Sequence, residues 1–472
     1  MTGRLFSAYR RLRAMLVAHP RLALTLSVAA LFALFDLFSL RTLDMDFGWH
    51  LQAGNYIRAH GIPTHDIFTY SARQFSWIDH EWGNDVVVSW LYSLGGYPLL
   101  AALYAALWSG GLVIAGARAR FGVLLLAAFA MFPYAGIRPV AWTVLFLAVT
   151  LRLLHSKKRW VVWLLPLLFV PWANLHAGFV SALALIVYIG WYERRPALFG
   201  VFALSTLATF INAYGPRLYV EIARTLFDPK LHSQVGEWHS FVFQFSALLF
   251  IAIWGAGGVL MEKRTLKIWL RPSIPLLLAA MSATRNTPLF IVAAVQESSR
   301  YIDGIAARVR ASKPVPGLGL IKVGAAVVAF GVLLLLAWQT FWPLNANRLA
   351  VYPQAAVTYL RANGCEGGNM FNDYNYGGYL IWKLPQQPVY IDGRMPSWKA
   401  PDGQKYMTKY YNLLGHPAEY RALFARYDIH CTLLQHGPLN ISLIARLLRD
   451  QWRPIINNKT YILLLAPDGS KS

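Results

Sequence analysis

Charged residues are scarce in this sequence, and acidic residues are the scarcer kind. Only 14% of the 472 residues are charged, whereas 56% are hydrophobic. This composition leaves too little polar surface for a soluble globule of this length. The bilayer is therefore the expected solvent for most of the chain.

Acidic residues number 22 against 44 Lys plus Arg, which gives a formal charge of +22. A nucleic-acid binder gathers its basic residues in a patch or stripe, but here they fall between apolar runs, so no nucleic-acid partner is expected. Gly-rich phosphate loops are absent too: Gly95-Gly96 and Gly110-Gly111 match no nucleotide fingerprint. These absences argue against a nucleotide site.

Cysteine is almost missing, with only Cys365 and Cys431, and both follow the last long apolar run. If that part of the chain lies outside the cytoplasm, a disulfide between them is permitted. We expect either this bond or two free thiols.

Long apolar runs, by contrast, are abundant. The first, Leu22 to Leu40, follows several arginines but no small-residue cleavage site follows it, so we interpret it as a retained helix. About eleven crossings are expected at roughly 20 residues each. They lie near 22–40, 95–116, 121–136, 140–154, 160–173, 178–192, 197–213, 241–260, 273–284, 287–297 and 318–340.

Basic residues concentrate in alternate segments between these runs. Those before the first helix and in every second loop are Arg4, Arg10, Arg11, Arg13, Arg21, Arg118, Arg120, Arg152, Lys157, Lys158, Arg159, Arg194, Arg195, Lys263, Arg264, Lys267, Arg271, Arg300, Arg308, Arg310 and Lys313. The positive-inside rule then places the N-terminus in the cytoplasm and the C-terminal region outside.

From about residue 343 the apolar runs shorten and the pattern alternates. It predicts strands at 368–371, 388–391 and 429–434, helices at 376–384, 417–427 and 441–451, and a hairpin around Asn457 and Asn458. The expected fold is thus an α-helical polytopic membrane domain over residues 1–342, with a functional first outer loop at 41–94, and a small extracytoplasmic α/β domain over 343–472.

The first outer loop carries the densest polar motif, Asp44-Met45-Asp46 followed by Trp49-His50 and, later, Asp79-His80-Glu81. A carboxylate just beyond a membrane helix is partly desolvated, which raises its pKa and its value as a base. Alternatively, Asp44, Asp46, His80 and Glu81 could bind a divalent cation such as Mg²⁺ or Mn²⁺. In a third interpretation, Asp44 and His50 merely cap an interfacial helix.

Other polar clusters fall on the same expected face: Arg138-Pro139, Asn174-Leu175-His176, Asn212-Ala213-Tyr214-Gly215, Glu237-Trp238-His239 and Arg285-Asn286. Ionisable groups near the membrane cost about 2.5–3.5 kcal/mol each, so their one-sided collection indicates a binding cavity. Arg138-Pro139 could instead start a helix and Asn212 with Gly215 could end one. An arginine such as Arg285 can bind a phosphate bidentately.

These features resemble the GT-C class of membrane glycosyltransferases, which includes oligosaccharyltransferases, protein mannosyltransferases and aminoarabinose transferases. The resemblance depends on Asp44-x-Asp46 with Trp49-His50, on Gly61-Ile62-Pro63-x-x-Asp66, and on the topology. The sequence is most similar to an uncharacterised bacterial group with Trp-His-Leu and His-Glu-Trp in this loop, and with the later segments Gly377–Trp382 and Ile391–Arg394.

The resemblance implies a polyprenyl-phosphate sugar donor on the periplasmic face of a bacterial inner membrane and a glycan, lipid or protein acceptor. Asp46 would act as base, supported by Asp44 and Glu81. The substrate would be bound by His50, Asp79, His80, Arg138, Asn174, His176, Glu237, Arg285 and Asn286. The sequence lacks the Asp-Glu pair of mannosyltransferases and a Trp-Trp-Asp motif, which argues against protein N-glycosylation.

Two other function classes remain open. A transporter or flippase would need polar groups through the depth of the bundle, yet apart from Asp36 few ionisable residues fall there. A non-catalytic assembly protein would use its outer domain to bind a partner.

Overall fold

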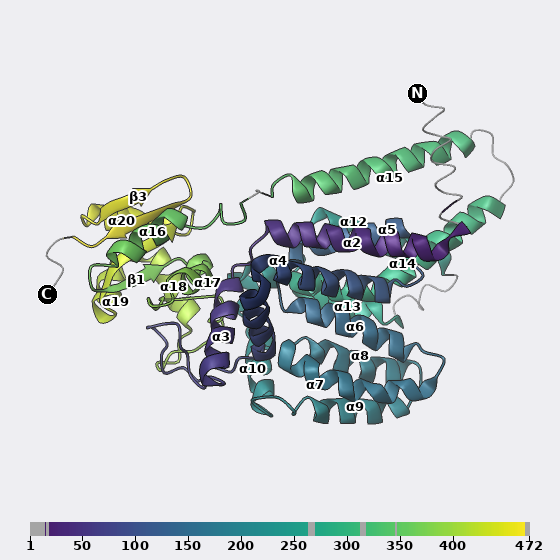
Figure 1. Cartoon of the computed structure of the whole chain (residues 1–472), viewed down its shortest axis with the longest axis horizontal. Coiled ribbons are helices and arrows are strands. Elements are labelled where there is room, and N and C mark those ends of the chain that lie inside the picture. The colour runs from purple at the N-terminus through teal and green to yellow at the C-terminus, as the bar shows by residue number, and fades with distance from the viewer. Residues whose placement is uncertain (1–14, 16–17, 263–269, 312–317, 345–346, 468–472) are drawn as a thin grey trace.

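The computed structural model describes every residue except 1–14, 16–17, 263–269, 312–317, 345–346 and 468–472. It divides into a helical bundle and a C-terminal α/β domain, which lie side by side (Figure 1). Several basic residues used to assign topology lie outside the described residues, namely Arg4, Arg10, Arg11, Arg13, Lys263, Arg264, Lys267 and Lys313.

The bundle has a helix at each of the predicted apolar runs. These are α2 (Pro20–Arg41), α4 (Trp82–Ala115), α5 (Phe121–Met131), α6 (Val140–Leu154), α7 (Leu165–Leu175), α8 (Phe179–Tyr192), α9 (Ala197–Ala208), α12 (Phe245–Met261), α13 (Ser273–Ser282), α14 (Thr287–Ala311) and α15 (Leu318–Phe341). Among the described residues, α2 and α4 alone combine the length and hydropathy of a membrane span. The number of crossings therefore stays a prediction.

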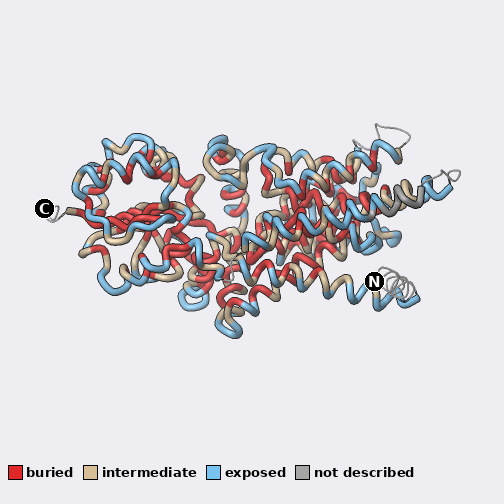
Figure 2. The backbone as a smooth tube through the Cα atoms, turned by 90° about the horizontal axis from the view of Figure 1, so that it is seen from above, coloured by how far each residue is buried: buried red, intermediate tan, exposed pale blue. Residues whose placement is uncertain are grey.

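Apolar side chains cover much of the bundle's outer surface. Leu24, Leu207 and Val328 are 54%, 60% and 66% exposed. Buried residues run along the bundle interior and through the sheet (Figure 2). Water would penalise such a contiguous apolar exterior, whereas lipid would not, so this surface supports a membrane location.

The first outer loop proves more helical than the sequence indicated. α3 (Phe47–His60) lies within it, and α4 begins at Trp82 instead of at residue 95. Gly96, whose φ is +63°, breaks α4 at the place where the crossing was expected to begin. The Gly-Gly pair thus marks a kink between two apolar helices, and residues 86–92 are apolar enough to extend the helix before it.

Short elements complete the bundle at its two ends. Near the C-terminal domain lie η1 (Phe132–Tyr134), α10 (Arg217–Leu226), α11 (Leu231–Gln234), η3 (Gly236–Trp238) and η5 (Thr284–Asn286), and η2 (Arg159–Leu164) precedes α7. We call the end where α2 stops and α3 begins the domain-facing end (Figure 1). At the opposite end Arg120 pairs with Asp303, and Arg308 donates to the carbonyl of Leu260. The segments around Arg120, Leu260 and Asp303 thus share an end, and the side of the membrane that this end faces stays a prediction.

The C-terminal domain has a four-stranded sheet with the order β1-β2-β4-β3. β1 (Asn369–Asn372) is parallel to β2 (Ile429–Gln435), while β4 (Tyr461–Leu465) is antiparallel to both β2 and β3 (Arg453–Asn457). Helices α16 (Gln354–Asn363), α17 (Gly377–Lys383), α18 (Tyr406–Gly415), α19 (Tyr420–Arg426) and α20 (Ile441–Arg449) surround it, together with η6 (Tyr374–Tyr376) and η7 (Pro417–Glu419). The strand predicted at 388–391 is wrong: Val389 forms only an isolated bridge with Thr69.

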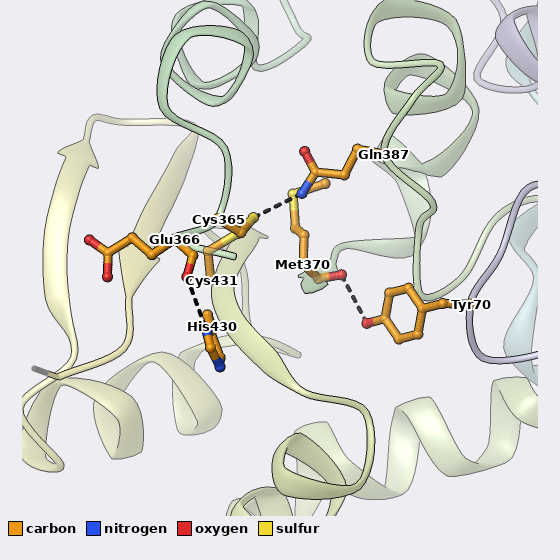
Figure 3. The surroundings of a disulfide bond; sticks show 7 residues. All are labelled: Tyr70, Cys365, Glu366, Met370, Gln387, His430 and Cys431. Carbon is orange, nitrogen blue, oxygen red and sulfur yellow. Dashed lines mark hydrogen bonds between the residues drawn. A yellow bond between two sulfur atoms is a disulfide. The ribbon is translucent and has the colours of Figure 1, made fainter. Parts of the chain in front are cut away.

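Cys365 and Cys431 form a disulfide that ties the turn after α16 to β2. Gln387 donates to Cys365 Sγ, and Tyr70, from the first outer loop, donates to the carbonyl of Met370 in β1 (Figure 3).

The two parts pack tightly where α3 meets α17. A Cβ on Gly48 would lie 1.9 Å from the carbonyl oxygen of Gly378, so this close approach requires glycine. The Phe47 and Trp382 rings pack edge to face with centroids 5.2 Å apart. The start of α3 is thereby held against the C-terminal domain.

Candidate functional site

The polar side chains of the first outer loop lie at the domain-facing end, where the chain leaves α2. Asp44 and Asp46 occupy the turn into α3, and the backbone N–H of Asp46 donates to Asp44 Oδ1 over 3.0 Å. Asp46 is the residue before α3, yet its side chain forms no capping hydrogen bond. The interpretation in which Asp44 and His50 merely cap a helix does not account for His50, which lies inside α3 with its Nδ1 2.5 Å from Asp85 Oδ1.

Asp44, Arg138, Glu237 and Arg285 form a chain of alternating charge. Arg138 Nε lies 2.8 Å from Asp44 Oδ2, and Arg138 Nη2 lies 2.7 Å from Glu237 Oε2. Arg285 Nη1 lies 2.9 Å from Glu237 Oε1. Four segments far apart in sequence thus contribute to one ion-pair network.

The network fixes the charges of its members. Burial disfavours the ionised form of Glu237, but Arg285 and Arg138 lower its pKa to about 2. Burial likewise opposes the charge of Arg138, and the carboxylates of Asp44 and Glu237 more than compensate, raising its pKa. Glu237 and Arg138 are therefore both ionised at neutral pH.

Asp46 behaves differently, because its neighbours favour protonation. Burial and the charge of Asp44 raise the pKa of Asp46 to about 7, against the opposing effect of His50. Its carboxylate also meets the C-terminal domain: a Cβ on Gly393 would lie 1.8 Å from Asp46 Oδ1. Asp46 can therefore exchange a proton near neutral pH.

Three histidines contact the buried carboxylate of Glu81. His176 Nε2, His80 Nε2 and His50 Nε2 lie 3.4, 3.5 and 3.7 Å from its oxygens. Burial would raise the pKa of Glu81, but the charge and hydrogen bond of His80, with His176 and His50, lower it well below its usual range. Glu81 is therefore a fixed negative charge.

The histidines differ in protonation. Burial disfavours the charged form of His80, yet Glu81 raises its pKa to about 9, and 38% of its side chain stays exposed to solvent. Burial lowers the pKa of His176 to about 4. Gly178 N–H donates to His176 Nδ1, which places the proton of the neutral ring on Nε2, facing Glu81.

Asp85 and Asn84 belong to the same site, although the sequence analysis missed them. His50 Nδ1 lies 2.5 Å from Asp85 Oδ1, and Asn84 accepts hydrogen bonds from Tyr104 and from Trp142 Nε1. A signal was present: an Asn-Asp pair follows Glu81 by one helical turn and precedes an apolar run.

Asp79, Asn174 and Asn286 were also predicted as site residues, and their hydrogen bonds go mainly to the backbone. Asp79 Oδ1 accepts from the backbone N–H of Glu81, and burial raises the Asp79 pKa well above its usual value. Asn174 accepts from Trp82 Nε1 and donates to the carbonyls of Val170 and Ile211. Asn286 donates to the carbonyl of Ala279. The contacts of the two asparagines fix helix ends.

The C-terminal domain adds Tyr374 and Gly393 to the site. Burial, with the charges of Asp46 and Glu237, raises the pKa of Tyr374 well above its usual value, so its hydroxyl stays protonated. The contribution of these two residues depends on the packing of the C-terminal domain against the bundle, which the sequence does not give.

The suggested metal ligands do not converge. Asp44 and Asp46 lie beside Arg138, whereas His80 lies beside Glu81. In the part of the chain that the structure describes, no group of three or more His, Cys, Asp or Glu side chains is arranged to hold a metal ion. We assign no chemical step to a metal.

Comparison with known proteins reveals a likeness in fold. No protein-family model and no curated protein matches the chain. Among solved structures, the chain is similar to the archaeal oligosaccharyltransferase AglB from Archaeoglobus fulgidus, in complex with an inhibitory peptide and a dolichol-phosphate. The TM-score is 0.54 and the sequence identity is 12%. The match covers 86% of this chain and 69% of that chain. The apo form of the A. fulgidus oligosaccharyltransferase matches with a TM-score of 0.49 and 12% sequence identity, over 86% of this chain and 69% of that chain. The first likeness shows that the chain shares its fold with this oligosaccharyltransferase, a kind of enzyme that the sequence was found to resemble.

Proposed function

We propose that the chain is a membrane glycosyltransferase that transfers a sugar from a polyprenyl-phosphate donor to an acceptor on the outer face of a bacterial inner membrane. The observation that carries the proposal is the placement of Asp46 beside the arginine network at one end of a GT-C-like bundle. The related archaeal structure holds a dolichol-phosphate and a peptide, which supports a lipid-linked donor in general.

Arg138 and Arg285 are suited to the donor phosphate. Both guanidinium groups point at one carboxylate, Glu237, and so mark a place where an anion is stabilised by two cations. Negative charge grows on the phosphate oxygen as the sugar leaves, and arginines already in position stabilise it. The apolar surface of the neighbouring helices offers a matching environment for a prenyl chain.

Asp46 is the residue that we assign as base. The acceptor hydroxyl attacks the anomeric carbon, the bond from that carbon to the phosphate oxygen breaks, and the hydroxyl proton passes to Asp46. General bases work best when their pKa lies near the operating pH, and the pKa of Asp46 lies at about 7. Glu81 fits this role less well, because its pKa is low and its charge is engaged by histidines.

The test is a transfer assay in proteoliposomes with a radiolabelled polyprenyl-phosphate sugar. We expect Asp46→Asn to lower the rate by about 10²–10⁴-fold, the usual contribution of a general base. Asp303→Asn, which breaks an ion pair with Arg120 at the opposite end, is the matched control and should retain the rate. Transfer by Asp46→Asn at the wild-type rate would refute the assignment, and labelled sugar that crosses the bilayer still attached to its lipid would indicate a transporter.

A further inference from the structure

One carboxylate serves two arginines at the domain-facing end. Glu237 Oε2 lies 2.7 Å from Arg138 Nη2, and its Oε1 lies 2.9 Å from Arg285 Nη1. The acid belongs to η3, Arg138 directly precedes Pro139 at the start of α6, and Arg285 belongs to η5. Glu237 therefore bridges two cations that would otherwise face each other across a gap.

A phosphate could take the same place. Its oxygens bind guanidinium groups as carboxylate oxygens do, with charge-assisted hydrogen bonds of similar length. The side chains are reachable, since Glu237, Arg138 and Arg285 are 28%, 23% and 34% exposed.

Each arginine also has a second contact that does not involve the Glu237 side chain, although Trp238 belongs to the same turn, η3. Arg138 Nε lies 2.8 Å from Asp44 Oδ2, and the Arg285 guanidinium lies 4.9 Å above the Trp238 ring. Both guanidinium groups would therefore keep their positions if the Glu237 carboxylate moved away.

We propose that Glu237 occupies the anion subsite before the donor binds, and that the donor phosphate displaces the Glu237 carboxylate from Arg138 and Arg285. The inference rests on the proposed function. It adds that the Glu237 carboxylate and the donor phosphate compete for the same two arginines. Unpaired charges in a partly desolvated site are costly, and the exchange leaves both arginines paired before and after binding.

The chain around Glu237 confines the movement to the Glu237 side chain. Upstream, Asp228 accepts from Ser397 Oγ over 2.8 Å, and the carbonyl of Gln234 accepts from Tyr411 over 2.9 Å. Downstream, Thr284 N–H donates to the carbonyl of His239 over 3.3 Å. The turn itself is held as well, because the carbonyl of Glu237 accepts from Thr284 Oγ1 over 3.3 Å. The exchange therefore needs only a change in the position of the Glu237 side chain, and Trp238 stays against Arg285.

The test measures binding of inorganic phosphate and of farnesyl phosphate to the full-length protein in phosphatidylcholine nanodiscs by calorimetry. Glu237→Gln keeps the shape of the side chain but removes the competing charge. Close charge pairs at interfaces couple by roughly 1.5 kcal/mol or more, so we expect at least about tenfold tighter binding. Glu262→Gln, which changes an acid paired with Arg271 at the opposite end, should bind like the wild type.

The outcomes separate the exchange from the proposed function. Tighter binding of both probes supports exchange with the phosphate group itself, and tighter binding of farnesyl phosphate alone supports exchange with a lipid headgroup. Unchanged or weaker binding by Glu237→Gln, with sugar transfer intact in the wild type, would overturn the exchange alone. Binding of neither probe to any variant would count against both proposals.

A second variant keeps the test decisive if Glu237→Gln does not fold. Glu237→Asp retains the charge but is one methylene shorter, so it cannot reach both arginines as Glu237 does. Its affinity for the probes should lie between those of the wild type and Glu237→Gln, and an affinity equal to that of the wild type would overturn the exchange.

Discussion

His50 Nδ1 lies 2.5 Å from Asp85 Oδ1, and both side chains are buried at the domain-facing end. The other ring nitrogen faces Glu81 at 3.7 Å. His50 thus connects a carboxylate on α4 with the carboxylate that gathers the histidines. This ring is one of the contacts that hold α3 against the start of α4, together with the hydrogen bonds of Ser89 to Asn55 and Arg58.

We expect Asp85→Ala to lower the free energy of unfolding by about 1–3 kcal/mol, because His50 Nδ1 would lose its hydrogen-bond partner inside a buried site. Asp85→Asn retains an oxygen acceptor for the His50 ring and should retain most of that stability. Unfolding of both variants in mixed micelles measures the difference, and equal stability of Asp85→Ala and wild type would show that the pair contributes nothing.

The pH dependence of transfer should follow Asp46. A base must be deprotonated, so kcat/KM should rise about tenfold per pH unit below pH 7 and level off above it, since the pKa of Asp46 is about 7. The stability effect has the opposite sign. Because the folded state raises this pKa, it binds more protons than the unfolded chain between about pH 4 and 7, and stability falls as pH rises through that range.

A pH series of initial rates and of unfolding midpoints checks both trends in one preparation. Asp46→Asn should reduce the slope of stability between about pH 4 and 7, because it removes this titrating group. A rate profile that is flat through pH 7 would contradict Asp46 as base.

The sequence predicted the positions of the helices well, because apolar runs identify them without tertiary information. It located the end of the bundle that holds Asp46, Arg138 and Glu237, since alternating basic loops assign polar clusters to one side. It missed the early start of α4 and the roles of Asn84 and Asp85, because these polar residues lie next to an apolar run that resembles an ordinary helix.

Pairing between residues far apart in sequence was beyond sequence reasoning. The strand predicted at 388–391 has apolar character, but Val389 N–H donates to the carbonyl of Phe68 in the first outer loop and not to a sheet strand. Gly393 and Tyr374 likewise become part of the site only because the C-terminal domain packs against Asp46.

Arg394 should be critical for holding the first outer loop to the C-terminal domain. Its Nη2 lies 2.7 Å from both Asp66 Oδ1 and Asp392 Oδ2, and its guanidinium lies 4.5 Å from the Trp77 ring centroid. Arg394→Met would leave two buried carboxylates without their cation and should cost about 3–5 kcal/mol of unfolding free energy.

The matched control for Arg394 is Arg421→Met. Arg421 pairs with Asp450 in the same domain, but its side chain is 67% exposed. Solvent screens exposed pairs, so Arg421→Met should cost much less unfolding free energy than Arg394→Met. A similar loss of unfolding free energy in the two variants would show that the buried position of Arg394 adds nothing to the stabilising effect of its ion pairs.

Removing the disulfide should destabilise the C-terminal domain. Cys365 and Cys431 are 66 residues apart, and a loop of that length is worth about 4 kcal/mol in the chain-entropy account. We expect Cys365→Ser with Cys431→Ser to lower the unfolding midpoint, and the wild type to migrate faster in a gel before reduction than after it. No mobility change on reduction would count against the bond.

Gly393→Ala should separate catalysis from folding. A Cβ at this position would lie 1.8 Å from Asp46 Oδ1, so the carboxylate or the Gly393 backbone must shift. A displacement of about 1 Å can cost on the order of 10²-fold in rate, and we expect a loss of that size in kcat. Gly415→Ala is the matched control, because a Cβ there meets nothing within 4 Å. If Gly393→Ala turned over as fast as Gly415→Ala with the same unfolding midpoint, the contact between Asp46 and the C-terminal domain would have no part in positioning the base.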